Sequence, residues 1–267
     1  MAKKKKKSGK KNQKSFIGKL FRIIGTIILS LFIISILITI LYRWVNPPVT
    51  PLMVIRKITN DAPIKKEWKD LEDISPNMVV CAVAAEDNNF LAHNGFDFGA
   101  IQKVVDERKT GKKNRGASTI SQQTAKNVFL WPERSWIRKG GEVYFTFLIE
   151  TFWSKERIME VYLNVIEMGN GIYGTETAAE SYFNTSAKKL TLRQAALITA
   201  IYPDPLHRDP AHPTSYLKRR ASKIAALTAK FGKVKFDEKS INKAEERYQK
   251  REEKRRAKND GKIIDLD

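Results

Sequence analysis

Cysteine is nearly absent from this sequence of 267 residues. Cys81 is the only one, which excludes an intrachain disulfide framework and suits a chain that could sit in an oxidising compartment without mispairing. Because Cys81 lies in the apolar run from Met78 to Ala85, we expect a buried, unreactive thiol. Strand signals are also weak and no internal repeat is evident. The sequence therefore predicts a mainly α-helical fold.

The central part of the chain lacks a charge excess. The formal net charge is +20, but residues 1–22 hold ten Lys or Arg and no acid, and residues 218–267 hold 17 basic and nine acidic residues. Residues 43–213 hold 22 basic and 20 acidic residues. The charge therefore does not predict a core that binds nucleic acid.

Charge is missing altogether from residues 23–42, a run of 20 mostly apolar residues. A helix of that length spans the roughly 30 Å hydrocarbon core of a bilayer. Lys and Arg precede the run, so the positive-inside rule places the basic tail, residues 1–22, in the cytoplasm and the chain after Trp44 outside it. A cleaved signal peptide is the alternative, but its apolar core is usually shorter and ends at small residues.

The remaining chain divides by composition. Three prolines within residues 47–51 break the first helix, and residues 43–74 form a charged linker or jaw approach. We expect one domain over residues 75–217. Residues 218–267 are rich in Lys, Arg and Glu, which predicts a basic tail that is partly helical or disordered, with disorder beyond Tyr248.

Two helices of the domain have clear signals. Residues 155–164 carry apolar side chains at three- and four-residue steps, which predicts one buried face; these are Ile158, Val161, Tyr162 and Val165. Thr191 and Gln194 have the spacing of a capping box at the start of the last strong helix.

Glu86 ends an apolar run that begins at Met78 and is followed by the string EDNNFLAHNGFD, residues 86–97. Partial burial makes a carboxylate more basic, and a general base working near neutral pH requires that. The string also supplies Asp87, Phe90 and His93. The alternative is a helix terminus followed by an ordinary polar loop.

A second polar string is GASTISQQTAKN, residues 116–127. Hydroxyls, amides and one cation next to backbone donors can bind sugar hydroxyls and phosphate oxygens. The candidate binding residues are Gly116, Ser118, Thr119, Gln122, Gln123, Lys126 and Asn127. The alternative is an ordinary polar loop and helix N-cap.

A third cluster places Arg134, Arg138 and Lys139 just ahead of Glu142. Cations of this kind, or a divalent metal held by the carboxylate, could stabilise a pyrophosphate leaving group. A structural ion pair from Arg138 to Glu142, four residues apart on a helix, is the alternative.

These strings together resemble the peptidoglycan glycosyltransferases of glycosyltransferase family 51, most closely their monofunctional biosynthetic form. The resemblance extends through the segments KERIMEVYLN at 155–164, GNGIYGTETAAESYF at 169–183 and LTLRQAALITAIYPDP at 190–205. It implies a lysozyme-like α-helical domain with a membrane-associated jaw, in the inner membrane of the cell. The implied substrates are lipid II and a polyprenyl-pyrophosphate-linked glycan chain.

The resemblance also implies roles for the residues. The family's general base, which deprotonates the acceptor sugar's 4-hydroxyl, falls on Glu86, and its second glutamate falls on Glu142. Its pyrophosphate-binding cations fall on Lys126 and Arg134, with Arg138 and Lys139 close by. A divalent cation, Mg²⁺ or Mn²⁺, commonly assists, with Glu142 its candidate ligand. Proteins of cell-wall synthesis or division are candidate partners.

Two other functions compete with this one. A lytic enzyme on the same fold would use its glutamate as an acid on a glycosidic oxygen, but the cations near Glu142 and the membrane segment favour a pyrophosphate-linked lipid donor. An inactive membrane scaffold is opposed by the presence of both Glu86 and Glu142. A transpeptidase domain is excluded, because its motifs occur in the wrong order and too little chain follows Ser215.

Overall fold

The computed structural model describes residues 7–110, 116–133 and 135–264. Arg134 and the first six residues of the expected basic tail lie outside the described residues. The chain forms two compact units, residues 1–45 and 46–267, and each is described by itself.

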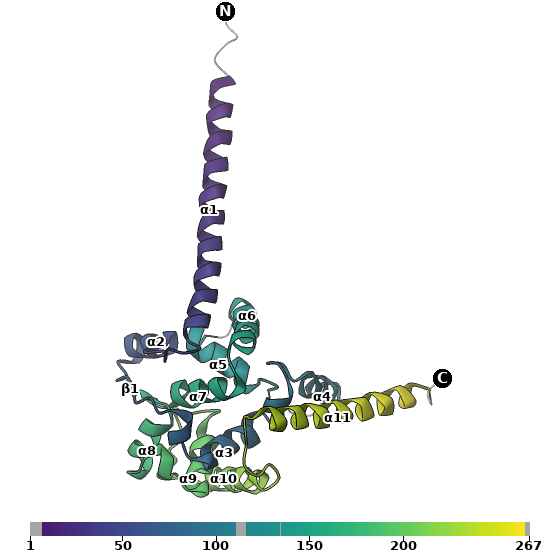
Figure 1. The fold of residues 1–267 in the computed structure, drawn as a ribbon. Helices are drawn as coiled ribbons and strands as arrows, with labels where there is room; N and C mark the ends of the chain where they lie inside the picture. The colour runs from purple at the N-terminus through teal and green to yellow at the C-terminus, as the bar shows by residue number, and fades with distance from the viewer. Residues whose placement is uncertain (1–6, 111–115, 134, 265–267) are drawn as a thin grey trace, which may run out of the picture. The chain divides into compact units, whose positions relative to one another are not determined.

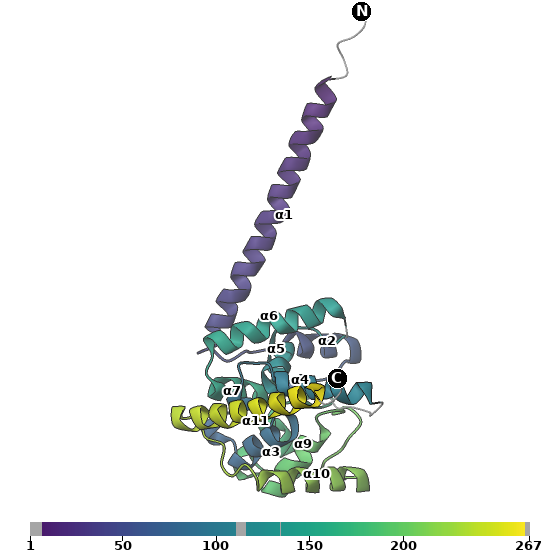
Figure 2. The same cartoon turned by 90° about the vertical axis from the view of Figure 1, so that its right-hand side faces the viewer.

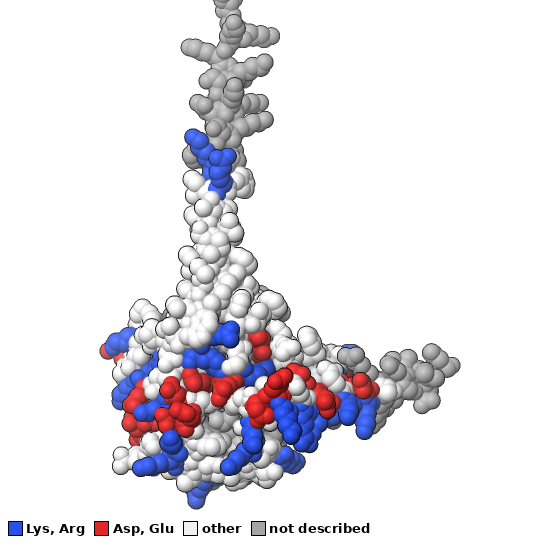
Figure 3. Space-filling model, viewed as in Figure 1, with Lys and Arg blue, Asp and Glu red and all other residues white. Residues whose placement is uncertain are grey.

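The first unit is dominated by helix α1, Lys7–Leu41. Within it, Gly18–Leu41 is the one stretch of the described chain that is both long and apolar enough to cross a membrane. Its large side chains, such as Phe21, Ile28 and Leu31, are exposed. In Figure 3 the surface of this helix below its blue Lys and Arg atoms is white, so no charged side chain shows there. The expected span, residues 23–42, falls on this helix apart from its last residue.

The second unit is mainly helical (Figures 1 and 2). Its helices are α2 Pro51–Asn60, α3 Pro76–Glu86, α4 Phe98–Lys109, α5 Ile120–Phe129, α6 Trp136–Phe152, α7 Lys155–Val165, α8 Thr175–Phe183, α9 Leu192–Ile201, α10 Ser215–Thr228 and α11 Glu238–Ile264. Short 3-10 turns occur at η1 Leu71–Asp73, η2 Phe90–Ala92 and η3 Ala187–Lys189. The mainly α-helical prediction is confirmed.

A small sheet closes one side of the unit. Its strands are β1 Lys65–Lys66, β2 Glu167–Gly169 and β3 Ile172–Tyr173, in the order β1-β3-β2. β1 runs parallel to β3, and β2 runs antiparallel to it. Gly171 turns the chain between β2 and β3 with a φ of +71°. A side chain there would collide with the Pro63 carbonyl, so glycine is required for both reasons.

Helix α3 is the centre of the core. Every residue from Met78 to Ala84 is buried, because α9 and α10 pack against the helix. A helix that is apolar all round is stable only when it is covered on every side. α5 packs against α6 and α7, and the predicted face of α7 is completely buried: Ile158, Val161, Tyr162 and Val165.

The C-terminal part differs from the expected tail. The predicted domain end at residue 217 falls inside α10, whose Leu217, Ala221 and Ile224 are buried on a helix that packs against α3 and α9. α11 continues as helix to Ile264 and buries Tyr248. A sparse apolar pattern was enough here, because Leu217, Ala221, Ile224 and Tyr248 are buried against the domain.

Candidate active site

Glu86 is the last residue of α3, so the buried helix fixes its position. Ser75 caps the start of the helix by accepting a hydrogen bond from the Asn77 amide, and Pro76 occupies the first turn. The Glu86 side chain is 17% exposed and lies 3.9 Å from the Arg220 guanidinium of α10. A carboxylate held in this way is oriented but still reachable from the cavity that it lines.

Two polar contacts orient one oxygen of Glu86. Gln123 Nε2 on α5 donates to Glu86 Oε2 at 2.9 Å, and the Tyr162 hydroxyl on α7 donates to Gln123 Oε1 at 3.2 Å. Tyr202 lies edge-on to Tyr162, with ring centroids 6.1 Å apart. Burial, followed by the Glu86 charge, raises the pKa of both hydroxyls well above the usual tyrosine range. Glu86 therefore lies beside two neutral, buried phenols.

The residues that follow Glu86 form a rigid loop. His93 Nε2 lies 3.0 Å from both oxygens of Asp87, and both side chains are almost completely buried. Asp87 Oδ2 also accepts a hydrogen bond from the Ile120 amide at 3.1 Å. Phe90 is fully buried, with the Lys155 ammonium 4.9 Å from its ring centroid. His93 and Phe90 thus hold the loop together, although the sequence suggested that they bind substrate.

Residues of the string at 116–127 hold the start of α5, line a cavity, or do both, as Thr119 and Gln122 do. Thr119 and Gln122 form a capping box at the start of α5, and Thr119 Oγ1 donates to the Gly95 carbonyl at 2.7 Å. The alternative reading of these two residues as a helix cap is correct. Gly116 and Ser118 are exposed, and each lines two adjoining cavities that also share Glu86.

The first of these cavities is rich in cations. Its volume is about 890 Å³. Among the described residues, five basic side chains line it: Arg56, Lys126, Arg138, Lys139 and Arg220. Gln122, Gln123 and Asn127 also line it, as do the acids Glu86, Glu142 and Glu167. Burial lowers the pKa of Lys126; nearby Glu142 opposes this and Arg138 adds to it. An anion entering this cavity meets a surplus of positive charge.

Glu142 holds two of those cations. Arg138 Nη1 lies 3.0 Å from Glu142 Oε2, and Lys139 pairs with the other oxygen. The Glu142 side chain is only 5% exposed. The ion pair that the sequence offered as an alternative is therefore present. It does not exclude a role in binding, because it aims both cations at the cavity that they line.

Two cavity cations were missed by sequence reasoning. Arg56 on α2 pairs with Glu167 through two contacts of 2.9 and 3.2 Å. Arg220 on α10 reaches Glu86. No local pattern marks either one, since Arg56 lies in the expected linker and Arg220 in the expected tail. Only the packing of α2 and α10 against the domain brings them to the site.

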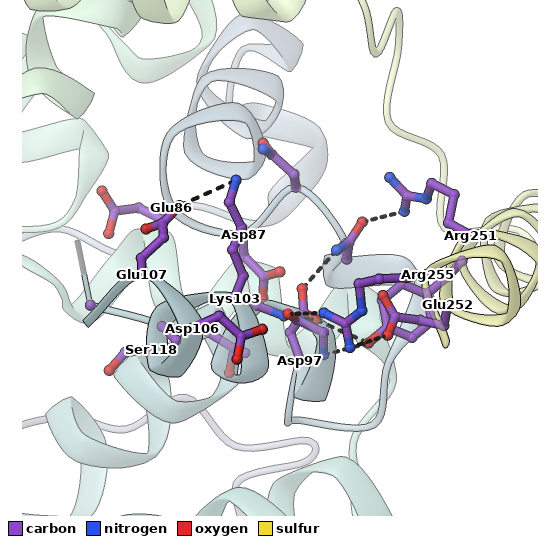
Figure 4. A pocket seen from close by; sticks show the side chains of 18 of the residues that line it. Glu86, Asp87, Asp97, Lys103, Asp106, Glu107, Ser118, Arg251, Glu252 and Arg255 are labelled. Atoms are coloured by element: carbon purple, nitrogen blue, oxygen red, sulfur yellow. Dashed lines mark hydrogen bonds and ion pairs between the residues drawn. The ribbon is translucent and has the colours of Figure 1, made fainter. Parts of the chain in front are cut away.

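The second cavity lies between α4 and α11 and has a volume of about 730 Å³. Figure 4 shows it with Glu86 and the α11 side chains on opposite sides of the view. Its lining mixes both signs of charge, with Lys103, Asp106 and Glu107 from α4, and Arg251, Glu252 and Arg255 from α11. Glu86 is therefore placed where a cation-rich cavity and a mixed cavity meet.

The described residues do not by themselves form a metal site at Glu142. Both of its oxygens are engaged by Arg138 and Lys139, whereas Mg²⁺ needs free oxygen ligands. Among the described side chains, one group of three acids is close enough together to hold an ion: Glu67, Glu176 and Glu180. Lys69 already lies 2.6 Å from Glu67 and 3.5 Å from Glu176.

Comparison with known proteins gives a consistent answer. The Transglycosylase family matches residues 53–229. The chain is 49% identical over 243 residues to the biosynthetic peptidoglycan transglycosylase of Bacteroides thetaiotaomicron, covering 88% of this chain and 97% of that protein. It is 50% identical over 211 residues to the protein of the same description from Caulobacter vibrioides, covering 78% and 92%. The protein so described from Shewanella oneidensis is 42% identical over 232 residues, covering 86% and 99%.

Proposed function

This chain belongs to the transglycosylase family and is a peptidoglycan glycosyltransferase, and on that premise we propose that it is membrane-anchored, acts on a lipid II-type substrate and uses Glu86 as its general base. The observation that carries the proposal is the place of Glu86, at the junction of a cation-rich cavity and a second, mixed one. In a sugar transfer of this kind, a base must reach the proton of the acceptor hydroxyl. The donor's anionic leaving group must at the same time lie near positive charge.

In the proposed reaction, Glu86 takes the proton from the 4-hydroxyl of the acceptor sugar. The hydroxyl oxygen forms a bond to the anomeric carbon of the donor, and the bond from that carbon to the pyrophosphate oxygen breaks. The electron pair leaves with the pyrophosphate. Attack from the face opposite an α-linked leaving group inverts the centre and gives a β-1,4 bond. Gln123 engages Oε2 of Glu86, whereas Oε1 lies 3.9 Å from Arg220, beyond hydrogen-bond distance, and is proposed as the oxygen that accepts the proton.

The cationic cavity is proposed to receive the pyrophosphate. Lys126, Arg138 and Lys139 line it together, and fixed positive charge stabilises the negative charge that develops on the leaving group. Glu142 acts by holding Arg138 and Lys139 in place. Pyrophosphate can leave as an anion when nearby cations balance its charge, so no general acid is required. Glycan cleavage by a lytic enzyme differs, because it needs an acid on the glycosidic oxygen.

We propose only that a divalent cation, Mg²⁺ or Mn²⁺, assists the reaction, without assigning it a ligand in the protein. The Glu142 carboxylate is engaged by two basic side chains, so we do not assign it as a metal ligand. Mg²⁺ is commonly bound through substrate phosphates together with one or two carboxylates. The cation would supply charge to the pyrophosphate, and no step above depends on it.

Membrane contact by the domain itself is proposed from α6. Trp136, Ile137 and Phe147 are 92%, 81% and 64% exposed, and large apolar side chains at that exposure mark an interaction surface. We propose this apolar surface as part of the membrane-associated jaw, which residues 43–74 were expected to approach. The same proposal places residues 1–22 in the cytoplasm and the domain outside the cytoplasmic membrane, because the Lys and Arg cluster precedes the apolar helix. Cell-wall synthesis or division proteins are its proposed partners.

The assignment of Glu86 is tested by polymerising purified lipid II in detergent with Mg²⁺, comparing wild type with Glu86→Gln. The amide has the size of the carboxylate but cannot accept the proton, so we expect wild type to make glycan and the variant to make almost none. Equal product from both proteins would remove Glu86 as the base. A wild-type protein that makes no glycan would contradict the activity itself.

A further inference from the structure

Helix α11 lies beyond the part of the chain that matches the family. The match ends at residue 229, and α11 covers Glu238–Ile264. The helix is strongly charged, yet it buries Tyr248 to 8% exposure and lies next to α4 in both views (Figures 1 and 2). Its contacts are made with the loop that follows Glu86 and with the start of α4.

Tyr248 completes the N-terminus of α4. Gly99 is in the first turn of that helix, where an amide has no partner inside the helix, and it donates to the Tyr248 hydroxyl at 3.2 Å. The same hydroxyl donates to Asp97 Oδ1 at 3.0 Å. Asp97 is the N-cap residue, which also accepts from the Ala100 amide at 2.8 Å. A distant helix therefore supplies a second cap to α4.

Two arginines extend this attachment. Arg251 Nη2 donates to Asn89 Oδ1 at 2.6 Å, and Asn89 Nδ2 in turn donates to Asp97 Oδ2 at 2.6 Å. Arg255 Nη1 donates to the Gly99 carbonyl at 2.7 Å and is held by Glu252 at 2.7 Å. The loop from Asp87 to Asp97 is thus fixed from outside, near its beginning and at its end.

The same α11 side chains are a wall of the mixed cavity. Tyr248, Arg251 and Arg255 line it together with Glu86, and Figure 4 shows the two arginines. The opposite wall is α4, whose first turn depends on Tyr248. The distance between the walls therefore depends on these contacts. The position of the loop that begins at Asp87 depends on them as well.

We propose that α11 is a positioning element that holds the Asp87–Asp97 loop and the start of α4, and so keeps the mixed cavity shaped for the sugar substrate that reaches Glu86. Tyr248, Arg251 and Arg255 are the positioning residues. The role in substrate binding rests on the proposed function. The attachment of the loop by α11 does not, and it can be measured in the absence of substrate.

The full-length protein is tested as Tyr248→Phe, Arg251→Gln and the double variant. Lys250→Gln is the matched control, because Lys250 is exposed on the same helix and loses the same charge as Arg251→Gln. The first readout is amide hydrogen exchange in residues 88–100, with the Gly99 amide as the specific reporter. We expect exchange there to become roughly tenfold faster or more in the double variant, since each 1.36 kcal/mol of lost interaction is tenfold, and unchanged in the control.

The second readout is KM against kcat for lipid II. A positioning role predicts a several-fold rise in KM with a smaller change in kcat, in the double variant and not in Lys250→Gln. Unchanged exchange in residues 88–100 would overturn the attachment. Faster exchange with an unchanged KM would show that α11 only stabilises the fold, and would overturn the role in binding. Wild-type glycan synthesis reports separately on the proposed function.

Discussion

Gln123 donates a hydrogen bond of 2.9 Å from Nε2 to Oε2 of Glu86. The amide is itself oriented by Tyr162, whose hydroxyl donates to Gln123 Oε1. Side chains on three different helices are therefore joined in a line that ends on the proposed base. This arrangement assigns different tasks to the two oxygens of one carboxylate.

Replacing Gln123 by Leu is expected to lower kcat for lipid II polymerisation roughly 10- to 100-fold, because a hydrogen bond to a charged group contributes about 1.5–3 kcal/mol. The side chain keeps a similar size, so the fold is expected to survive. Tyr162→Phe is the companion variant, and its loss should be smaller, since it removes only the contact behind Gln123. If Tyr162→Phe lost more activity than Gln123→Leu, Tyr162 would not act on Glu86 through Gln123.

Glu142→Gln is expected to lose at least about 100-fold in activity, the scale seen when a group that stabilises developing charge is removed. Its two cations, Arg138 and Lys139, would lose the anion that orients them. Ser118→Ala should be impaired less than about tenfold, because it removes one neutral hydroxyl from the lining. Wild-type rates for both variants would remove the site described here. Far-ultraviolet circular dichroism checks that each variant is folded.

Lys126 should give the activity an alkaline limit. Burial lowers the pKa of this lysine, so as the pH rises it loses its proton, and its charge, earlier than an exposed lysine does. In Lys126→Arg the charge persists, because a guanidinium is not deprotonated in this range. The falling limb of the pH profile of kcat/KM should therefore move to higher pH. An unmoved limb would show that another group sets the limit.

Cys81 should be inert in the folded protein. Its side chain is completely buried, and burial raises the pKa of the thiol to about 12. Since the thiolate is the reactive form, a thiol reagent at pH 8 should find no reactive group in native protein. It should find one group per chain after unfolding in urea, which also serves as the control. Rapid labelling of the native protein would contradict the burial of α3.

Local patterns predicted the local parts of the structure. The end of α3 at Glu86, the buried face of α7 and the capping box of Thr191 and Gln194 all follow from residue types at short spacings, and the structure has each of them. The same patterns placed the polar strings 86–97 and 116–127 in the site. They could not separate the residues that line a cavity from those, such as His93 and Phe90, that hold the loop.

The long-range contacts were beyond that reasoning. Arg220 approaches Glu86 only because α10 packs on α3, and Arg56 faces the cavity only because α2 pairs it with Glu167. Composition predicted a partly helical tail, which α11 bears out, but not its contacts with the domain. Among the polar residues of α11 the single aromatic Tyr248 makes two specific hydrogen bonds, and a mean over many residues does not detect such a contact.

The bond from Tyr248 to Asp97 joins residues 151 positions apart. Such a contact can form only after nearly the whole chain has been synthesised, whereas α1, at the N-terminus, emerges first. The anchor is thus made before the loop beside Glu86 can be locked. Closing a contact across so long a segment also carries a large entropic cost that only the folded domain offsets. The order of synthesis therefore delays the contact between Tyr248 and Asp97 until α11 has been made.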